Sequence, residues 1–283
     1  SVSCRQALSV SYRQALCCAN KLSSVSCMFV ALLSLCMMAS CSRVQGRAPL
    51  LELRESYLPF VALYYVPPNA ANEPLPLLLY LHGAGESGDN VRDLISEGAT
   101  GTPPVELENG TALPILAKRF VVVAPQTNRG WAPNEVVEFV DLLLQRQPSQ
   151  LPKLDPARCY VTGHSMGGGG AIAAAAAMPH RFAAVVPVAP SGSVRAGELK
   201  GVPIWSFHGT NDVVVPSSIS EHLHARLKSA GVPDADAKLT LYEKAPAPKG
   251  WPDYDGHGSP MPAYATPELY RWLLEKRREF VMP

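Results

Sequence analysis

The stretch from Tyr160 to Ala177 constrains the fold of this chain more than any other. It predicts a β-strand, a tight turn Gly163-His164-Ser165-Met166-Gly167, and an alanine-rich helix that begins near Met166. The flanking glycines suit a sharp strand-to-helix bend, where a Cβ at either position would crowd the backbone. An incidental glycine-rich turn is the alternative, but the strand before the turn and the alanine run after it favour a turn that presents Ser165 as a nucleophile.

The composition indicates a globular chain. Of its 283 residues, 47% are apolar and 17% charged, which is enough for one α/β domain and an additional N-terminal segment. A net charge of +1 gives no reason to expect a nucleic-acid partner. Only one of the seven cysteines, Cys159, lies beyond residue 42. We therefore predict no disulfide framework and no metal site in the body of the chain, and a buried, apolar role for Cys159.

The first 48 residues differ from the rest. Residues 1–16 are two copies of an octapeptide, which has no core-forming pattern, and Met28 is an alternative start. Residues 28–41 are apolar but too short to span a bilayer, as in a signal peptide. Their end, Met38-Ala39-Ser40-Cys41, is similar to a bacterial lipoprotein processing box, which makes Cys41 a candidate lipid anchor. A simple secretory signal is the alternative. We predict a secreted or membrane-anchored extracytoplasmic protein with a catalytic domain over residues 49–283 and no membrane span.

Strands and helices alternate along this domain. Apolar runs predict strands at 60–66, 75–82, 120–125, 160–164, 182–189, 204–208 and 238–243. We predict helices around 89–97, at 134–147 with Asn134 as its cap, and at 166–177, 217–230 and 267–280, with long loops at 98–114 and 245–262. This alternation predicts an α/β fold, with a mostly parallel sheet flanked by helices on both faces.

A serine hydroxyl needs an imidazole to take its proton, and the imidazole needs a carboxylate to fix its tautomer. Asp212 follows the predicted strand 204–208 and precedes a helix, so it is our candidate for this carboxylate. The alternative is a carboxylate that only caps the turn or the helix. The other downstream acids fit less well, because they precede a strand or lie within a few residues of the candidate base: Asp234, Asp236, Asp253 and Asp255.

His257 is our candidate for the base. It lies between small residues in the loop after the last predicted strand, whereas His222 and His224 fall inside a helix. The glycine-rich segment after strand 75–82 suits a second oxyanion donor, so we predict the backbone N–H groups of Ala84 and Met166 as the pair. His82 and His208 are expected to brace their turns, and His164 has no assigned role.

With these residues in place, the chain resembles the α/β-hydrolase superfamily, and within it the carboxylesterase, dienelactone-hydrolase and predicted-peptidase group of serine hydrolases. The matching segments span roughly residues 52–280 in order: Leu81–Gly88, Val123–Gln126, Gly163–Gly168, His208–Asp212 and Pro267–Leu274. One departure is the Pro-rich stretch 245–255, which is longer than usual and leaves the resting position of His257 open. The short segment 190–203 leaves no room for a helical lid domain.

The resemblance implies hydrolysis of a small-molecule ester through an acyl-enzyme, with Ser165, Asp212 and His257 as a triad and without a cofactor. A peptidase or thioesterase using the same triad, and a non-catalytic binding protein on the same fold, are the alternatives. Trp131, Trp251 and Tyr254 lie in loops at the expected active-site end. They are candidates to line an acyl or aryl pocket, with simple loop packing as the other reading.

Overall fold

The structure, a computed structural model, describes residues 49–68, 70, 73–192, 199 and 201–278. The predicted N-terminal segment 1–48, with its signal-like stretch and Cys41, lies outside the described residues. Within them, no helix is both long and apolar enough to cross a bilayer.

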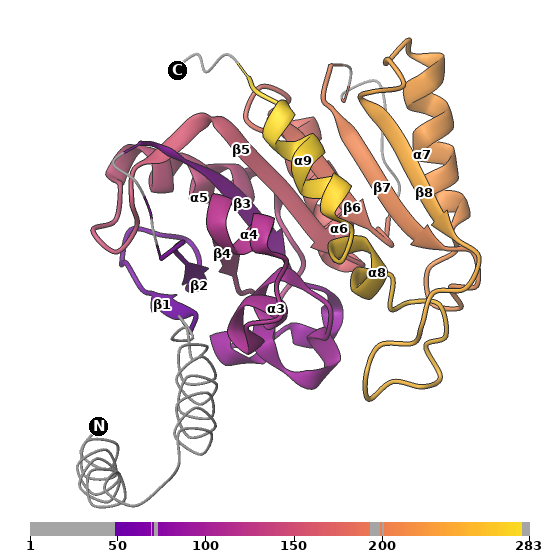
Figure 1. The fold of residues 1–283 in the computed structure, drawn as a ribbon, viewed down its shortest axis with the longest axis horizontal. Helices are drawn as coiled ribbons and strands as arrows, with labels where there is room; N and C mark the ends of the chain where they lie inside the picture. Colours follow the sequence, from indigo (N-terminus) through magenta and orange to yellow (C-terminus); the bar gives the residue numbers. More distant parts are fainter. Residues whose placement is uncertain (1–48, 69, 71–72, 193–198, 200, 279–283) are drawn as a thin grey trace, which may run out of the picture. The chain divides into compact units, whose positions relative to one another are not determined.

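The strands of the described part of the chain form one sheet, in the order β1-β2-β4-β3-β5-β6-β7-β8 (Figure 1). Their bounds are Leu51–Leu53, Ala62–Tyr65, Leu75–Leu81, Val121–Pro125, Leu154–His164, Ala184–Val188, Ile204–Gly209 and Ala237–Tyr242 for β1 to β8. The pairs from β4 to β8 are parallel, whereas β2 pairs antiparallel with both β1 and β4. The predicted mostly parallel sheet is confirmed. The short edge strand β1 was not predicted, since its three residues carry too little pattern.

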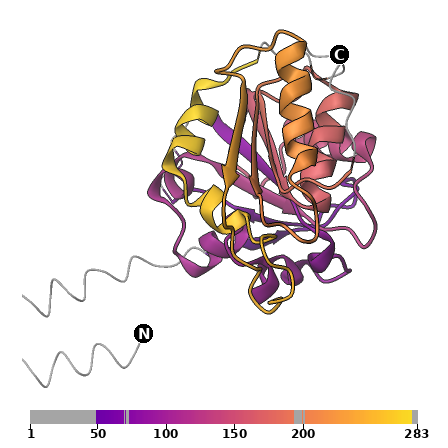
Figure 2. The ribbon, with the colours of Figure 1, turned by 90° about the vertical axis from the view of Figure 1, so that its right-hand side faces the viewer.

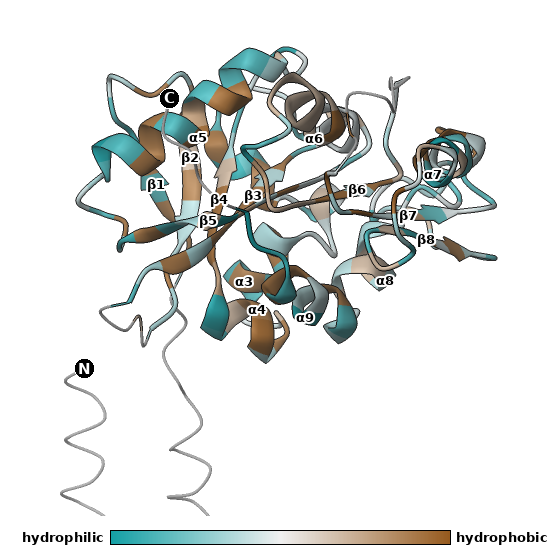
Figure 3. Cartoon of the chain, turned by 90° about the horizontal axis from the view of Figure 1, so that it is seen from above, coloured by the Kyte–Doolittle hydropathy of each residue, from teal (hydrophilic) through white to brown (hydrophobic). Residues whose placement is uncertain are grey.

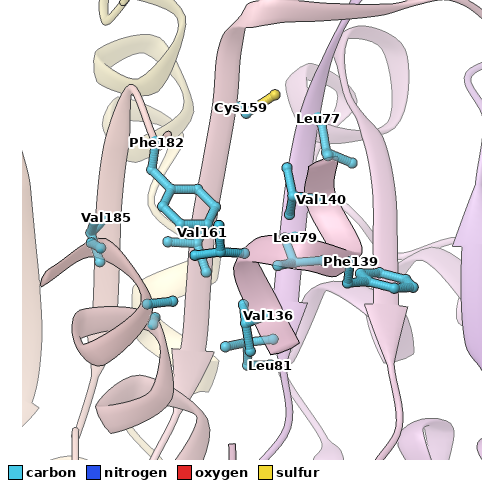
Figure 4. Packing of buried hydrophobic residues seen from close by; sticks show 14 of the residues in the cluster. Leu77, Leu79, Leu81, Val136, Phe139, Val140, Cys159, Val161, Phe182 and Val185 are labelled. Atoms are coloured by element: carbon cyan, nitrogen blue, oxygen red, sulfur yellow. The ribbon is translucent and has the colours of Figure 1, made fainter. Parts of the chain in front are cut away.

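Both faces of the sheet are covered, which explains the continuous apolar run in β3. Successive side chains of a strand point to opposite faces. Leu77, Leu79 and Leu81 belong to the core on one face, where α5 (Pro133–Arg146) and α6 (Met166–Ala177) pack (Figure 4). Leu78 and Tyr80 belong to the core on the other face.

The two helix layers are visible when the molecule is viewed along the sheet (Figure 3). α5, α6 and α7 (Ser218–Ser229) lie on one side of the sheet. α3 (Pro103–Asn109), α4 (Pro114–Arg119), α8 (Pro260–Tyr264) and α9 (Pro267–Glu275) lie on the other. The prediction of helices on both faces is confirmed.

Several helix boundaries differ from the prediction. The predicted loop 98–114 contains α3, α4 begins at its end, and the predicted loop 245–262 runs into α8. Each of these helices has proline in its first turn, a position where the missing N–H costs nothing, so prolines that suggested loops in fact begin helices. Around 89–97 the chain forms short 3₁₀ turns instead of an α-helix. Asn134 does not cap α5, which begins one residue earlier after Ala132.

The segments that follow β3, β5, β7 and β8 come together at one edge of the sheet. These strands run parallel to one another, so their carboxyl ends lie side by side. The long loop after β8 extends beyond this edge (Figures 1 and 2). In open α/β sheets this is where ligands bind.

Candidate active site

Ser165 lies between the last residue of β5 and the first residue of α6, with φ 54° and ψ −116°. A positive φ is unfavourable for a residue with a Cβ and is held only by its surroundings. A Cβ at Gly163 would collide with the backbone of Gly167, and one at Gly167 would collide with the carbonyl group of Leu81. The two glycines therefore let the turn pack directly against β3, and Ser165 is left at the end of the sheet.

The predicted oxyanion donors come from two different segments of the site. Met166 is the first residue of α6, so its N–H belongs to the first turn, whose N–H groups have no acceptor within the helix. Ala84 begins the 3₁₀ turn η1 (Ala84–Glu86) and lines the same pocket as Ser165. Their roles as oxyanion donors stay predictions.

Asp212 and His257 are in direct contact. His257 Nδ1 lies 2.8 Å from Asp212 Oδ2, and both side chains are buried. The other oxygen, Oδ1, accepts hydrogen bonds from the backbone N–H groups of Val214 and Val215 at 2.9 and 2.8 Å. Burial opposes ionisation of Asp212, but hydrogen bonds from His208, His257 and the Val215 N–H outweigh it and hold its pKa below the usual value.

His208, the penultimate residue of β7, lies next to the Asp212 carboxylate. Its Nε2 lies 2.9 Å from the carbonyl oxygen of Val215 and 3.4 Å from Asp212 Oδ2. Because carbonyl and carboxylate oxygens only accept, Nε2 carries the proton, and the Ser220 hydroxyl donates to Nδ1 at 2.8 Å. The fully buried His208 thus braces the turn that carries Asp212.

His82 holds the segment that follows β3. The backbone N–H of Thr127 donates to His82 Nε2 at 3.1 Å, which leaves Nδ1–H to donate to the Gly83 carbonyl at 2.7 Å. Trp131 Nε1–H donates to the carbonyl of His82 at 3.0 Å. Burial lowers the pKa of His82, in keeping with a neutral ring. His82 therefore fixes the backbone next to the predicted donor Ala84.

Glu86 is a site residue that the sequence analysis missed. It is 7% exposed, lines the pocket, and its backbone carbonyl accepts a hydrogen bond from Gln126 Nε2. Burial raises the pKa of Glu86, while the backbone N–H groups of Gly83 and Glu86, and His257, oppose this shift. Gly83, which precedes the three-residue 3₁₀ turn η1, has no side chain that could form a capping box with Glu86, so no pattern in the sequence marked this glutamate.

His164 was also left without a role. Its Nε2 lies 2.9 Å from the carbonyl oxygen of His257, and the two rings are 4.6 Å apart between centroids. It lines the same pocket as Ser165 and His257. Its position between two candidate catalytic residues follows from the turn geometry, which no sequence pattern reports.

Ser165, His257, His164 and Glu86 line one pocket of about 340 Å³. Its lining includes Ala84, Ser165 and His257 together with two exposed aromatic residues, Trp251 and Tyr254. The two aromatic rings lie 5.1 Å apart, and the Tyr254 ring lies 6.4 Å from that of His257.

Trp131 does not line the pocket, and the prediction that placed it there is wrong. It is 8% exposed and packs in the core, with its ring edge-on to that of His82 at 4.8 Å. A Cβ at Gly170 would touch the Trp131 side chain, so this glycine of α6 makes room for the indole. Whether a loop tryptophan turns toward the core or the pocket depends on the neighbouring helix, which sequence position alone does not reveal.

In the described part of the chain, no group of three or more His, Cys, Asp or Glu side chains is arranged to hold a metal ion. Cys159 is a fully buried residue of β5, and burial raises the pKa of its thiol to about 12. It is therefore a packing residue and not a second nucleophile.

Known proteins with a similar fold agree with this architecture. Residues 121–229 match a family described as PETase, PET hydrolase-like. No curated protein matches the sequence. Among solved structures, a thermostable esterase is similar with 28% identity and a TM-score of 0.64, over 81% of this chain and 63% of the esterase chain. The chain thus spans less than two thirds of that esterase's length.

Two further structures share the fold. A putative dienelactone hydrolase from Klebsiella pneumoniae has 14% identity and a TM-score of 0.55, over 80% of this chain and 97% of its own. An acylaminoacyl peptidase has 13% identity and a TM-score of 0.52, over 83% of this chain and 42% of its own. With a mixed sheet covered on both faces, a strained serine between strand and helix, and these similarities, the chain has the α/β-hydrolase fold.

Proposed function

We propose that this protein is a carboxylesterase that works through an acyl-enzyme on Ser165. The observation that carries the proposal is the buried hydrogen bond of 2.8 Å between His257 Nδ1 and Asp212 Oδ2, beside the pocket that Ser165 and His257 line together. Because Nδ1–H donates to Asp212, the lone pair of the neutral imidazole lies on His257 Nε2, which can act as the base.

In the first half-reaction, His257 removes the proton of the Ser165 hydroxyl as Ser165 Oγ attacks the ester carbonyl carbon. The resulting oxyanion accepts hydrogen bonds from the N–H groups of Ala84 and Met166, each contributing on the order of 3 kcal/mol to the barrier reduction. The His257 imidazolium then protonates the leaving alcohol. In the second half-reaction, a water molecule activated by His257 releases the acid and regenerates Ser165.

Trp251 and Tyr254 support a substrate with an apolar acyl or aryl group. They are 46% and 39% exposed and their rings lie on one side of the pocket, where an apolar substituent could cover both. The name of the matching family makes PET a further substrate to test. We expect Trp251→Ala to raise KM for p-nitrophenyl benzoate more than for p-nitrophenyl acetate.

The proposal is tested with the full chain and its Ser165→Ala variant. Both are treated with a fluorophosphonate probe, and hydrolysis of p-nitrophenyl acetate and butyrate is measured. We expect labelling and turnover of the parent alone. A folded parent that neither labels nor turns over ester would contradict the proposal and favour a binding protein on this fold. Matched thioester and anilide substrates then distinguish an esterase from a thioesterase or a peptidase.

The cellular location is a separate proposal. We infer from the signal-like residues 28–41 that the enzyme is secreted, or anchored through a lipid on Cys41. Metabolic labelling with a fatty-acid probe in a bacterial host, compared with Cys41→Ala, tests the anchor. Labelling that persists in Cys41→Ala contradicts it.

A further inference from the structure

His164 lies where the three segments of the candidate site meet. It ends β5 directly before Ser165, and only 9% of its surface is exposed. Its Nε2 is 2.9 Å from the carbonyl oxygen of His257. On its other side, a Cβ at Gly83 would lie 3.5 Å from His164 Nδ1, so the segment before Ala84 packs against the same ring.

The hydrogen bonds fix the tautomers of the two neighbouring rings. The carbonyl oxygen of His257 only accepts, so His164 Nε2 carries the proton and Nδ1 does not. His257 instead carries its proton on Nδ1, toward Asp212. The centroids of the two rings lie 4.6 Å apart.

Catalysis requires His257 to gain a second proton, and a charged neighbour would oppose this. Burial, followed by repulsion from His257, lowers the pKa of His164 to about 3. The charge of Asp212 raises the pKa of His164, and His208 lowers it. Both residues come from β7 and the turn that follows it. The ring of His164 is therefore neutral near neutral pH and places no positive charge beside His257.

The long loop that carries His257 needs such a contact. The loop is tied to the turn after β7 by bonds from Asn211 to Ala245 and Asp255, and the His257 N–H donates to the carbonyl of Tyr254 in the same loop. These bonds do not join the backbone of His257 to the strand that carries the nucleophile. The bond from His164 does so directly, because His164 immediately precedes Ser165 in the chain.

We propose that His164 is a positioning residue: its Nε2–H holds the backbone of His257 in register with Ser165, and its ring packs against the catalytic imidazole. This inference rests on the proposed esterase function. A displacement of about 1 Å at a reacting group can cost about 100-fold in rate, so loss of this contact should lower kcat and leave KM nearly unchanged.

Three substitutions of His164 distinguish the contribution of its Nε2–H donor from that of its ring. In His164→Gln the side-chain amide can place an N–H near the position of Nε2. His164→Asn is too short to reach the carbonyl, and His164→Phe keeps a ring without a donor. His222→Gln, on the exposed surface of α7, is the matched control. For each variant, kcat and KM for p-nitrophenyl butyrate, the rate of fluorophosphonate labelling and the melting temperature are measured.

We expect kcat and the labelling rate to fall by about 10- to 100-fold in His164→Asn and His164→Phe. In His164→Gln they should remain within a few-fold of the parent. Equal loss in the Gln and Asn variants, or parental rates in the Asn variant, overturns the inference. If Phe unfolds the protein, the comparison of Gln with Asn still decides. A parent that neither labels nor turns over ester refutes the esterase function itself, which is a distinct outcome.

Discussion

The Asp212 carboxylate is surrounded by groups that donate to it: His257, His208, and the backbone N–H groups of Val214 and Val215. A carboxylate can accept from all of them, because it has acceptor sites on both oxygens. An amide of the same shape would turn an NH₂ group toward at least one donor. The site therefore requires the negative charge of Asp212, and not only a side chain of its size.

For this reason we expect Asp212→Asn to lower kcat by roughly 1,000- to 10,000-fold, since the amide can hold His257 in the wrong tautomer. The melting temperature should fall as well. Asp253→Asn, in an exposed part of the loop before His257, is the control and should leave both quantities unchanged. A kcat for Asp212→Asn within tenfold of the parent would show that Asp212 does not orient the base.

A second residue-scale prediction concerns the turn glycines. An added methyl group at Gly167 would collide with the backbone of Leu81, which cannot move without distorting β3. We expect Gly167→Ala to destabilise the protein by about 1–3 kcal/mol or more in urea unfolding, and to abolish fluorophosphonate labelling. Gly85→Ala is the control, because nothing lies within 4 Å of the methyl position there. Comparable stability of the two variants would contradict the close approach.

At the scale of elements, the loop between β8 and α8 determines where His257 rests. Asn211, in the turn after β7, makes two hydrogen bonds to Ala245, through Nδ2 at 3.0 Å and Oδ1 at 2.9 Å, and a third to Asp255 at 3.2 Å. One side chain thus links the turn of Asp212 to both the start and the far part of the loop.

We therefore expect Asn211→Ala to loosen this loop, with kcat lowered by roughly tenfold and faster proteolytic cleavage between residues 245 and 258. The neighbouring Thr210→Ala is the control, since Thr210 bonds only the end of β8 and the residue after it. Limited trypsin and thermolysin digestion followed by mass spectrometry maps the cuts. Unchanged digestion in Asn211→Ala would mean that other contacts hold the loop.

At the scale of the whole molecule, buried histidines make folding sensitive to pH. Burial lowers the pKa of both His164 and His82, so the folded state disfavours their protonation, while the unfolded chain takes up protons near pH 6.5. Their contribution to stability is thus complete above pH 6.5 and decreases as the pH falls toward their folded-state pKa values. Glu86 acts in the opposite direction, since its folded-state pKa is raised.

We expect the free energy of unfolding to decrease between pH 6.5 and pH 4.5, with each neutral histidine contributing a slope of at most about 1.4 kcal/mol per pH unit. Urea unfolding at several pH values measures this slope. It should be smaller in His164→Phe, and His180→Phe, at an exposed position, should leave it unchanged. A slope that is the same in the parent and in His164→Phe would contradict the neutral, buried state of His164.

Much of this protein follows from the sequence alone. The apolar run of β3 indicated a strand covered on both faces, and the glycine-flanked serine indicated a strand, a turn and a helix in that order. Both are local properties, set by side-chain periodicity and by backbone sterics within a few residues. The candidates Ser165, Asp212 and His257 came from the glycine-flanked turn and from the chemistry of a triad, which needs an acid and a base downstream of the serine.

The tertiary structure decided what depends on contacts between distant segments. In the folded chain Trp131 packs in the core, and Glu86 and His164 line the pocket. The prolines at 103, 114 and 260 begin helices. None of these outcomes is encoded in a local pattern, since each is set by which neighbour fills the adjacent space. The sequence determined the elements and the candidate groups, and packing between the loops determined which side chains support them.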